Sequence, residues 1–145
     1  MTGNRDAPAG PLDVVTLEQL GRRAVTHPLV ADWMLEPDSL SPRKLVIRFD
    51  EGQYPTAIQR ARIDIRWFEG GDYSVHYVET HGDDERWQCR WDRHDKPTAP
   101  RTHFHPPPNA EGVESSSRQA ETHLDVLFVT LGWVGDRIGT LYEND

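Results

Sequence analysis

An alternation of apolar and polar residues over residues 57–68 constrains the fold of this chain more than any other feature. The apolar positions are Ala61, Ile63, Ile65 and Trp67, and the polar positions are Arg60, Arg62, Asp64 and Arg66. Side chains two residues apart lie on the same side of a β-strand, so this period predicts a strand with one face on a core and the other in water. Residues 69–72, Glu-Gly-Gly-Asp, are typical of a hairpin turn, so we expect an antiparallel partner directly afterwards.

Three other segments have strand character. Residues 44–49 form a compact apolar run, residues 73–77 alternate after the hairpin turn, and residues 86–92 alternate after a second turn at 81–84. Short turns join antiparallel neighbours, so the simplest topology is a four-stranded antiparallel meander. Most aromatic side chains of these strands occupy apolar positions, and we expect them in the core. An RNA-recognition sheet instead displays aromatic rings on its open face, which counts against readout of bases by stacking.

Helices are predicted on both sides of the strand region. Thr16 can cap a helix that runs to about residue 25, with Gln19 as its capping-box partner. A second short helix is expected over residues 28–35, because proline is tolerated in a first helical turn. A closing helix is predicted over residues 117–142 from an apolar stripe at helical spacing. The fold class is therefore α+β, with a four-stranded antiparallel meander sheet packed against N-terminal and C-terminal helices.

The length of 145 residues fits a single domain. We expect residues 1–15 to be a disordered leader and residues 16–145 to form the α+β domain. Cys89 is the only cysteine, so an internal disulfide and a cysteine-rich zinc site are both excluded. The first twelve residues lack the apolar stretch of a signal peptide, and no apolar run is long enough to span a membrane. We therefore expect a cytoplasmic protein with no membrane partner.

The charge composition is acidic, with 24 Asp and Glu against 16 Lys and Arg and a formal net charge of -8. This balance argues against a protein that coats DNA, because phosphate binding needs clustered cations. Arginine accounts for 14 of the 16 basic residues. Such a composition is common in salt-adapted proteins, whose carboxylates keep the surface solvated. A GC-rich genome, which favours arginine codons, is the alternative explanation.

Five arginines share the polar face of the predicted sheet: Arg60, Arg62, Arg66, Arg86 and Arg90. Guanidinium groups offer a planar fork of donors that suits phosphate. The same face carries Asp64 and Asp92, so a solvated surface balanced by cross-strand ion pairs remains an alternative. The candidate substrate-binding residues on this face are Arg62, Arg66, Arg90 and His76.

A long irregular connection is predicted over residues 95–117, and it contains His103 and His105. Loops of this length inside a compact domain are usually functional or disordered. Two histidines at this spacing, together with His94, could serve as general acid and base, could begin a metal site, or could simply face solvent. We assign neither a metal nor a cofactor.

The segments Arg90-Trp91-Asp92-Arg93-His94 and His103-Phe104-His105-Pro106 resemble the TumE-type toxin family of prokaryotic toxin–antitoxin systems. The resemblance covers roughly residues 45–141. It implies a DNA-binding antitoxin as partner and, less directly, RNA as the target. The residues that match the motif positions, and that become the catalytic candidates, are Asp92, His94, His103 and His105, with Arg90 beside them.

In a ribonuclease without metal, one histidine could deprotonate the 2′-hydroxyl group and another could protonate the leaving oxygen, while Arg90 holds the phosphate. Two alternatives stay open. The chain could be a non-catalytic module that binds protein or nucleic acid, or a His-ligated metal protein of unknown reaction. The sequence also leaves open whether the chain forms a homodimer.

Overall fold

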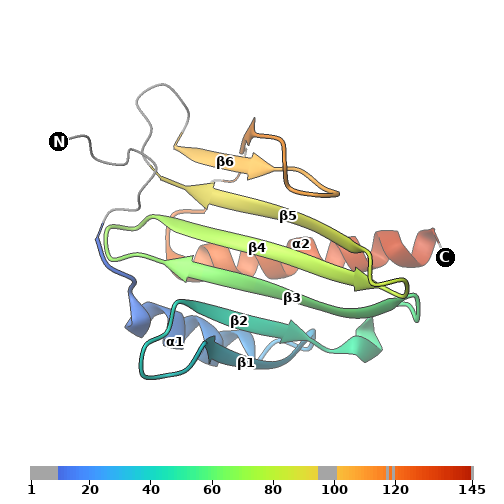
Figure 1. Cartoon of the computed structure of the whole chain (residues 1–145), viewed down its shortest axis with the longest axis horizontal. Helices are drawn as coiled ribbons and strands as arrows, with labels where there is room; N and C mark the ends of the chain where they lie inside the picture. The colour runs from blue at the N-terminus through green and yellow to red at the C-terminus, as the bar shows by residue number, and fades with distance from the viewer. Residues whose placement is uncertain (1–9, 95–100, 117, 119, 145) are drawn as a thin grey trace.

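The computed structural model describes residues 10–94, 101–116, 118 and 120–144. Its elements are, in chain order, α1 (Val14–Ala24), β1 (Val30–Glu36), β2 (Lys44–Phe49), the short 3-10 helix η1 (Glu51–Gln53), β3 (Ile58–Trp67), β4 (Tyr73–His81), β5 (Arg86–Arg93), β6 (Thr102–His105), β7 (Glu114–Ser115) and α2 (His123–Glu143). The strands form one antiparallel sheet in sequence order from β1 to β7, and both helices lie on one side of it (Figure 1). The α+β class and the antiparallel meander are confirmed.

The sheet has seven strands within the described residues, so the prediction of four was wrong. Strand β1 occupies the segment that was predicted to be a second short helix. Its residues pair with β2, with Trp33 opposite Ile47 and Leu35 opposite Leu45. A seven-residue segment is too short for its local pattern to decide between helix and strand, and the partner strand decides instead.

The other two unpredicted strands lie in the segment that was expected to be irregular. β6 pairs with β5, placing His103 opposite Asp92 and His105 opposite Arg90. β7 adds only Glu114–Ser115 to the edge. Strands of four and two residues are too short to show a period, and the prolines around them obscure it further. Residues 95–100 of the predicted connection lie outside the described residues.

Both helices begin at positions other than those predicted. α1 is capped by Asp13, whose side chain accepts hydrogen bonds from the Thr16 backbone N–H (3.1 Å) and hydroxyl group (2.7 Å). Leu12 also forms a bridge with Phe68 of the first hairpin, so residues 10–15 of the predicted leader are structured and only residues 1–9 lie outside the described part. α2 begins at His123 because the Thr122 hydroxyl caps it, accepting from the Asp125 N–H (3.1 Å).

The core lies between the two helices and the inner face of the sheet. Its centre is aromatic, with the Trp133 ring of α2 at 5.0 Å from Tyr77 and 4.9 Å from Trp91. The alternation over 57–68 is confirmed, since Ala61, Ile63, Ile65 and Trp67 are all buried. Neither helix combines the length and the apolar composition that a membrane span requires, as far as the chain is described.

Gly21 of α1 marks the closest approach of the helix to the sheet. A Cβ atom at this position would overlap the Trp33 ring of β1. We expect Gly21→Ala to lower the free energy of unfolding by about 1–3 kcal/mol through overpacking, despite the better helix propensity of alanine. Urea denaturation of the purified protein measures this change.

Gly139 of α2 is the matched control, because a Cβ atom there meets nothing within 4 Å. Gly139→Ala should raise the free energy of unfolding by about 0.4–1 kcal/mol. If both substitutions change the stability in the same direction, the packing of α1 against Trp33 is not as described.

Candidate functional site

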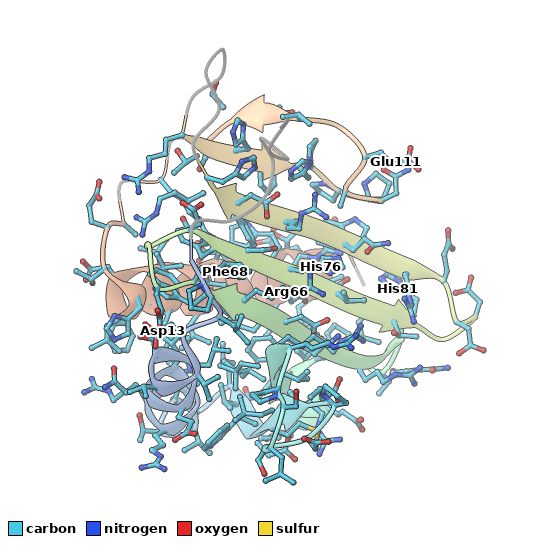
Figure 2. All side chains as sticks on the ribbon, turned by 60° about the vertical axis from the view of Figure 1, so that its left-hand side comes forward. Asp13, Arg66, Phe68, His76, His81 and Glu111 are labelled. Atoms are coloured by element: carbon cyan, nitrogen blue, oxygen red, sulfur yellow. The ribbon has the colours of Figure 1, made fainter. Side chains whose placement is uncertain are left out.

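The outer face of the sheet, opposite the helices, carries the predicted site residues. The register pairs Ser74 with Arg66 and Asp92, and pairs Asp92 in turn with His103. The adjacent row pairs His76 with Arg90, and Arg90 with His105. The predicted sharing of one face by the arginines and His76 is therefore confirmed, and Figure 2 shows Arg66 and His76 on it.

A cavity of about 410 Å³ opens at one end of this face, where β3, β4, β5 and β6 lie side by side. Six of the eight predicted site residues line it: Arg66, Arg90, Asp92, His94, His103 and His105. Phe68 and Val113 add apolar surface to its wall. The two histidines that the sequence placed in a loop stand on a strand, which fixes their spacing relative to Asp92.

Asp92 is the centre of the cavity, with a side chain that is 11% exposed. Its Oδ2 atom accepts hydrogen bonds from Arg90 Nε (3.0 Å) and from His105 Nε2 (2.9 Å). Its Oδ1 atom is buried and has no hydrogen-bond partner among the described residues. An unsatisfied buried acceptor costs about 1–3 kcal/mol, so an oxygen left in this state is a feature that function can explain.

His105 stands between two groups that can only accept hydrogen bonds. Its Nδ1 atom faces the Gly112 carbonyl oxygen (2.8 Å), and its Nε2 atom faces the Asp92 carboxylate (2.9 Å). Both contacts are hydrogen bonds at the same time only when both ring nitrogens carry protons. These two contacts fix the orientation of the ring and hold its Nε2 atom against the Asp92 carboxylate.

His94 and His103 form a second part of the site. Their ring centroids are 5.1 Å apart, with an angle of 34° between the ring planes. His103 is 3% exposed, and the backbone N–H of His94 donates to the Arg101 carbonyl oxygen (3.0 Å). The Nδ1 atom of His94 is buried with no hydrogen-bond partner in the described part of the chain. Both rings line the cavity side by side.

Two arginines supply positive charge to the cavity. Arg90 uses its Nε atom on Asp92, which leaves its terminal nitrogens for another ligand. Arg66 is exposed and makes no ion pair with any carboxylate of the described residues. The arrangement thus brings three imidazoles, one carboxylate and two free guanidinium ends around one space, the kinds of group that acid–base chemistry on an anion uses.

Arg93 also lines the cavity, and the sequence analysis did not single it out. Its guanidinium donates from Nε and Nη2 to the Gly71 carbonyl oxygen (2.9 and 2.6 Å) and lies 4.9 Å from the Tyr73 ring centroid. It is 6% exposed, so it positions the hairpin between β3 and β4 rather than offering charge to a ligand. In the sequence, only its position next to Asp92 indicated that Arg93 lies near the cavity.

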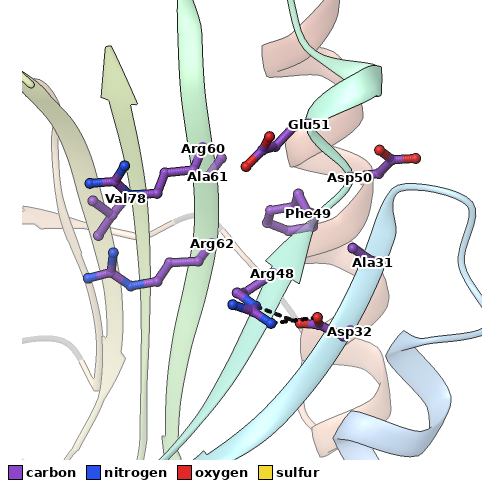
Figure 3. A pocket seen from close by; sticks show the side chains of 10 residues that line it. All are labelled: Ala31, Asp32, Arg48, Phe49, Asp50, Glu51, Arg60, Ala61, Arg62 and Val78. Atoms are coloured by element: carbon purple, nitrogen blue, oxygen red, sulfur yellow. Dashed lines mark hydrogen bonds and ion pairs between the residues drawn. The ribbon is translucent and has the colours of Figure 1, made fainter. Parts of the chain in front are cut away.

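Arg62 and His76 lie outside this cavity. Arg62 donates from Nε to Asp64 (3.1 Å) and lines a second cavity of about 360 Å³ near β1, β2 and β3 (Figure 3). His76 Nε2 forms a hydrogen bond with Gln88 Oε1 (2.8 Å), and burial holds the pKa of His76 below its usual value. The predicted set of substrate-binding residues is therefore divided between two places on the face.

Metal binding and nucleophilic attack by the cysteine are two other chemistries to compare with the described residues. Among residues 10–94, 101–116, 118 and 120–144, no three His, Cys, Asp or Glu side chains come together in a way that could hold a metal ion. Cys89 is buried in the core, and this burial raises the pKa of its thiol to about 12. A thiol of this kind is not a nucleophile at neutral pH.

Fold and site together define a small α+β protein whose uncovered sheet face bears a cavity rich in histidine and arginine. A family model described as Toxin TumE matches residues 17–138, a span that includes every residue of the cavity. The chain belongs to the TumE toxin family. No curated protein and no solved structure matches it. Membership gives the protein a toxin role and implies an antitoxin as its partner.

Proposed function

We propose that the toxin acts on RNA at the cavity around Asp92, by cleaving the phosphodiester backbone without a metal ion. The observation that carries this proposal is the meeting of His94, His103 and His105 with two arginines around one buried carboxylate. Three histidines in one cavity, two on β6 and one directly after β5, can supply both of the proton transfers that such a cleavage needs. We also propose that the antitoxin binds DNA and that the pair acts in the cytoplasm.

The residues divide the reaction as follows. A ring nitrogen of His94, which lines the cavity, removes the proton from a ribose 2′-hydroxyl group, and the resulting oxygen attacks the adjacent phosphorus. The bond from phosphorus to the 5′-oxygen breaks, and His105 donates a proton to that leaving oxygen. The products are a 2′,3′-cyclic phosphate and a free 5′-hydroxyl group. Arg66 and Arg90 neutralise the charge that develops on the phosphoryl oxygens.

A non-catalytic binding module is the second candidate, favoured by the arginines of the outer face that lack carboxylate partners. In that case the ion pair of Asp92 with His105 is structural, and the face docks a protein or a nucleic acid. The two candidates differ in what removal of a histidine does. A binding module retains its effect on cells in the histidine variants and loses it in Arg62→Gln and Arg66→Gln.

Expression of the chain without its antitoxin is expected to arrest growth. His94→Ala or His105→Ala should relieve the arrest at equal protein level, because each removes one of the two groups that transfer protons in the proposed reaction. RNA cleavage by the purified variants should fall by about 10²–10⁴-fold. Colony counts after induction and electrophoresis of a labelled RNA measure the two effects.

The matched control is His123→Ala, which changes a histidine of α2 on the other side of the sheet, bonded to Gln19 (3.1 Å). It should leave growth arrest intact. Circular dichroism of each variant shows whether it is folded. A folded His105→Ala protein that still arrests growth, or relief that appears only in unfolded protein, removes the histidines from the mechanism.

A further inference from the structure

The charge of the outer face differs from the charge of the whole chain. On β1 to β5 the register gives this face seven basic residues, namely Lys44, Arg48, Arg60, Arg62, Arg66, Arg86 and Arg90. It gives the same face four acidic residues, namely Glu36, Asp32, Asp64 and Asp92. The face is therefore positive in a protein whose formal net charge is -8.

Ion pairs neutralise some of the basic residues on this face and leave others without a carboxylate partner. Arg48 pairs with Asp32, Arg62 with Asp64, and Arg90 with Asp92, while Lys44 contacts Glu36 and Asp64. The three arginines that form no carboxylate pair with the described residues are Arg60, Arg66 and Arg86. All three are exposed. Their charge is available to an anion from outside.

Arg66 lies at the cavity around Asp92, and the other two lie at the far end of the sheet. Arg60 and Arg86 both flank Thr80 of β4, because the register pairs Thr80 with each of them. Arg60 also lines the second cavity together with Arg48 and Arg62, as Figure 3 shows. Arg60 and Arg66 are six positions apart along β3, which corresponds to about 20 Å. The reacting cavity and the far arginines are thus too far apart for one small ligand.

Between its two ends, this face offers no large aromatic ring on which a base could stack. The outer positions of β2 to β5 hold no Trp, Tyr or Phe side chain. Proteins that stack bases display such rings on the open face of a sheet, whereas a positively charged groove follows the backbone. Neither helix covers the face, since α1 and α2 pack on the opposite side (Figure 1).

We propose that the outer face from Arg66 to Arg60 and Arg86 is a path for the phosphodiester backbone of a single RNA strand whose reacting phosphate lies in the cavity around Asp92. The inference rests on the proposed function and specifies its substrate as a polymer bound without regard to sequence. The outer positions of β3 are Arg60, Arg62, Asp64 and Arg66. The charge of Asp64 is balanced by Arg62 and Lys44, so one row of mainly guanidinium groups follows one backbone. Charge complementarity selects the occupant, because phosphates meet the three arginines that no carboxylate neutralises.

The test measures binding and not cleavage. The probes are 2′-O-methyl oligoadenylate and oligouridylate strands, which lack the attacking hydroxyl, at lengths of about 4 and about 16 nucleotides. Fluorescence anisotropy should show that the long strands bind at least about tenfold more tightly than the short ones, with similar affinity for the two bases. The double variant Arg60→Gln/Arg86→Gln should lose about tenfold in affinity for the long strands. Its plot of log affinity against log salt should flatten by about 1.4, since each phosphate contact on a single strand contributes about 0.7.

The matched control is Arg22→Gln/Arg23→Gln, which removes two arginines from the last turn of α1, a helix on the other side of the sheet. It should bind RNA as the unaltered protein does. The path is overturned if the two double variants bind equally, if a matched RNA duplex binds as tightly as the strand, or if Arg60→Gln/Arg86→Gln spares RNA binding and instead abolishes neutralisation by the antitoxin. Arginine-dependent binding of a strand that the protein never cleaves would leave the path in place and remove only the proposed cleavage.

Discussion

Replacing Glu79 with leucine is expected to lower the free energy of unfolding by about 3–5 kcal/mol. Glu79 is fully buried on the inner face of β4 and accepts two hydrogen bonds from Arg137 of α2, at 2.7 and 2.9 Å. It also accepts a hydrogen bond from the Tyr77 hydroxyl group (2.7 Å). Leucine fills a similar volume but leaves the guanidinium of Arg137 between the sheet and the helix with no carboxylate. Total stabilities of such domains are about 5–15 kcal/mol, so the variant lies near the edge of folding.

Two controls separate this effect from a general cost of losing an ion pair. Asp32 and Arg48 form an equally close bidentate pair, but their side chains are 46% and 53% exposed. Asp32→Asn should therefore cost less than about 1 kcal/mol. The double variant Glu79→Leu/Arg137→Met should recover most of the loss, because it removes the second charge as well. Urea denaturation of the unaltered protein, of the single variants Glu79→Leu and Arg137→Met, and of the double variant gives the coupling energy, and a coupling near zero contradicts a buried ion pair.

This pair also shows where prediction from the sequence stopped. The period of two along β4 predicts that Tyr73, Val75 and Tyr77 face the core, and all three are buried. The same period places Glu79 on that side, where a carboxylate is costly unless it is paired. Its partner Arg137 lies 58 residues further along the chain, on a helix whose position over the sheet the sequence does not specify.

The sequence also predicted only part of the candidate site. Alternation alone placed Arg66, Arg90 and Asp92 on one face, and a local motif drew attention to the histidines. The strand β6, which puts His103 and His105 opposite β5, could not be predicted, because four residues among prolines show no period. Local patterns therefore predicted which side of the sheet carries the candidate residues, and only the pairing of strands showed which of them meet.

The prediction with the largest expected effect on activity concerns Asp92. Asp92→Asn keeps the size of the side chain and removes the charge that the His105 Nε2 atom faces at 2.9 Å. The amide oxygen can still accept the hydrogen bond from Arg90 Nε at the position of Oδ2, but the amide carries no negative charge. The proposed acid His105 thereby loses its charged partner. RNA cleavage should fall by about 10²–10⁴-fold while the fold is retained.

Asp64 offers a matched control on the same face, since it is 9% exposed and pairs with Arg62 and Lys44 outside the cavity around Asp92. Asp64→Asn should lower stability and leave cleavage in place. Nitrogen NMR of the His105 ring tests the cause directly, because the Nε2 signal should report the hydrogen bond to the Asp92 carboxylate in the unaltered protein and should shift in Asp92→Asn. If the Asp92→Asn protein cleaves RNA at the normal rate, Asp92 has no role in the proposed reaction. An unchanged ring in an inactive variant would instead show that Asp92 acts on the substrate itself, through the Oδ1 atom that no described residue contacts.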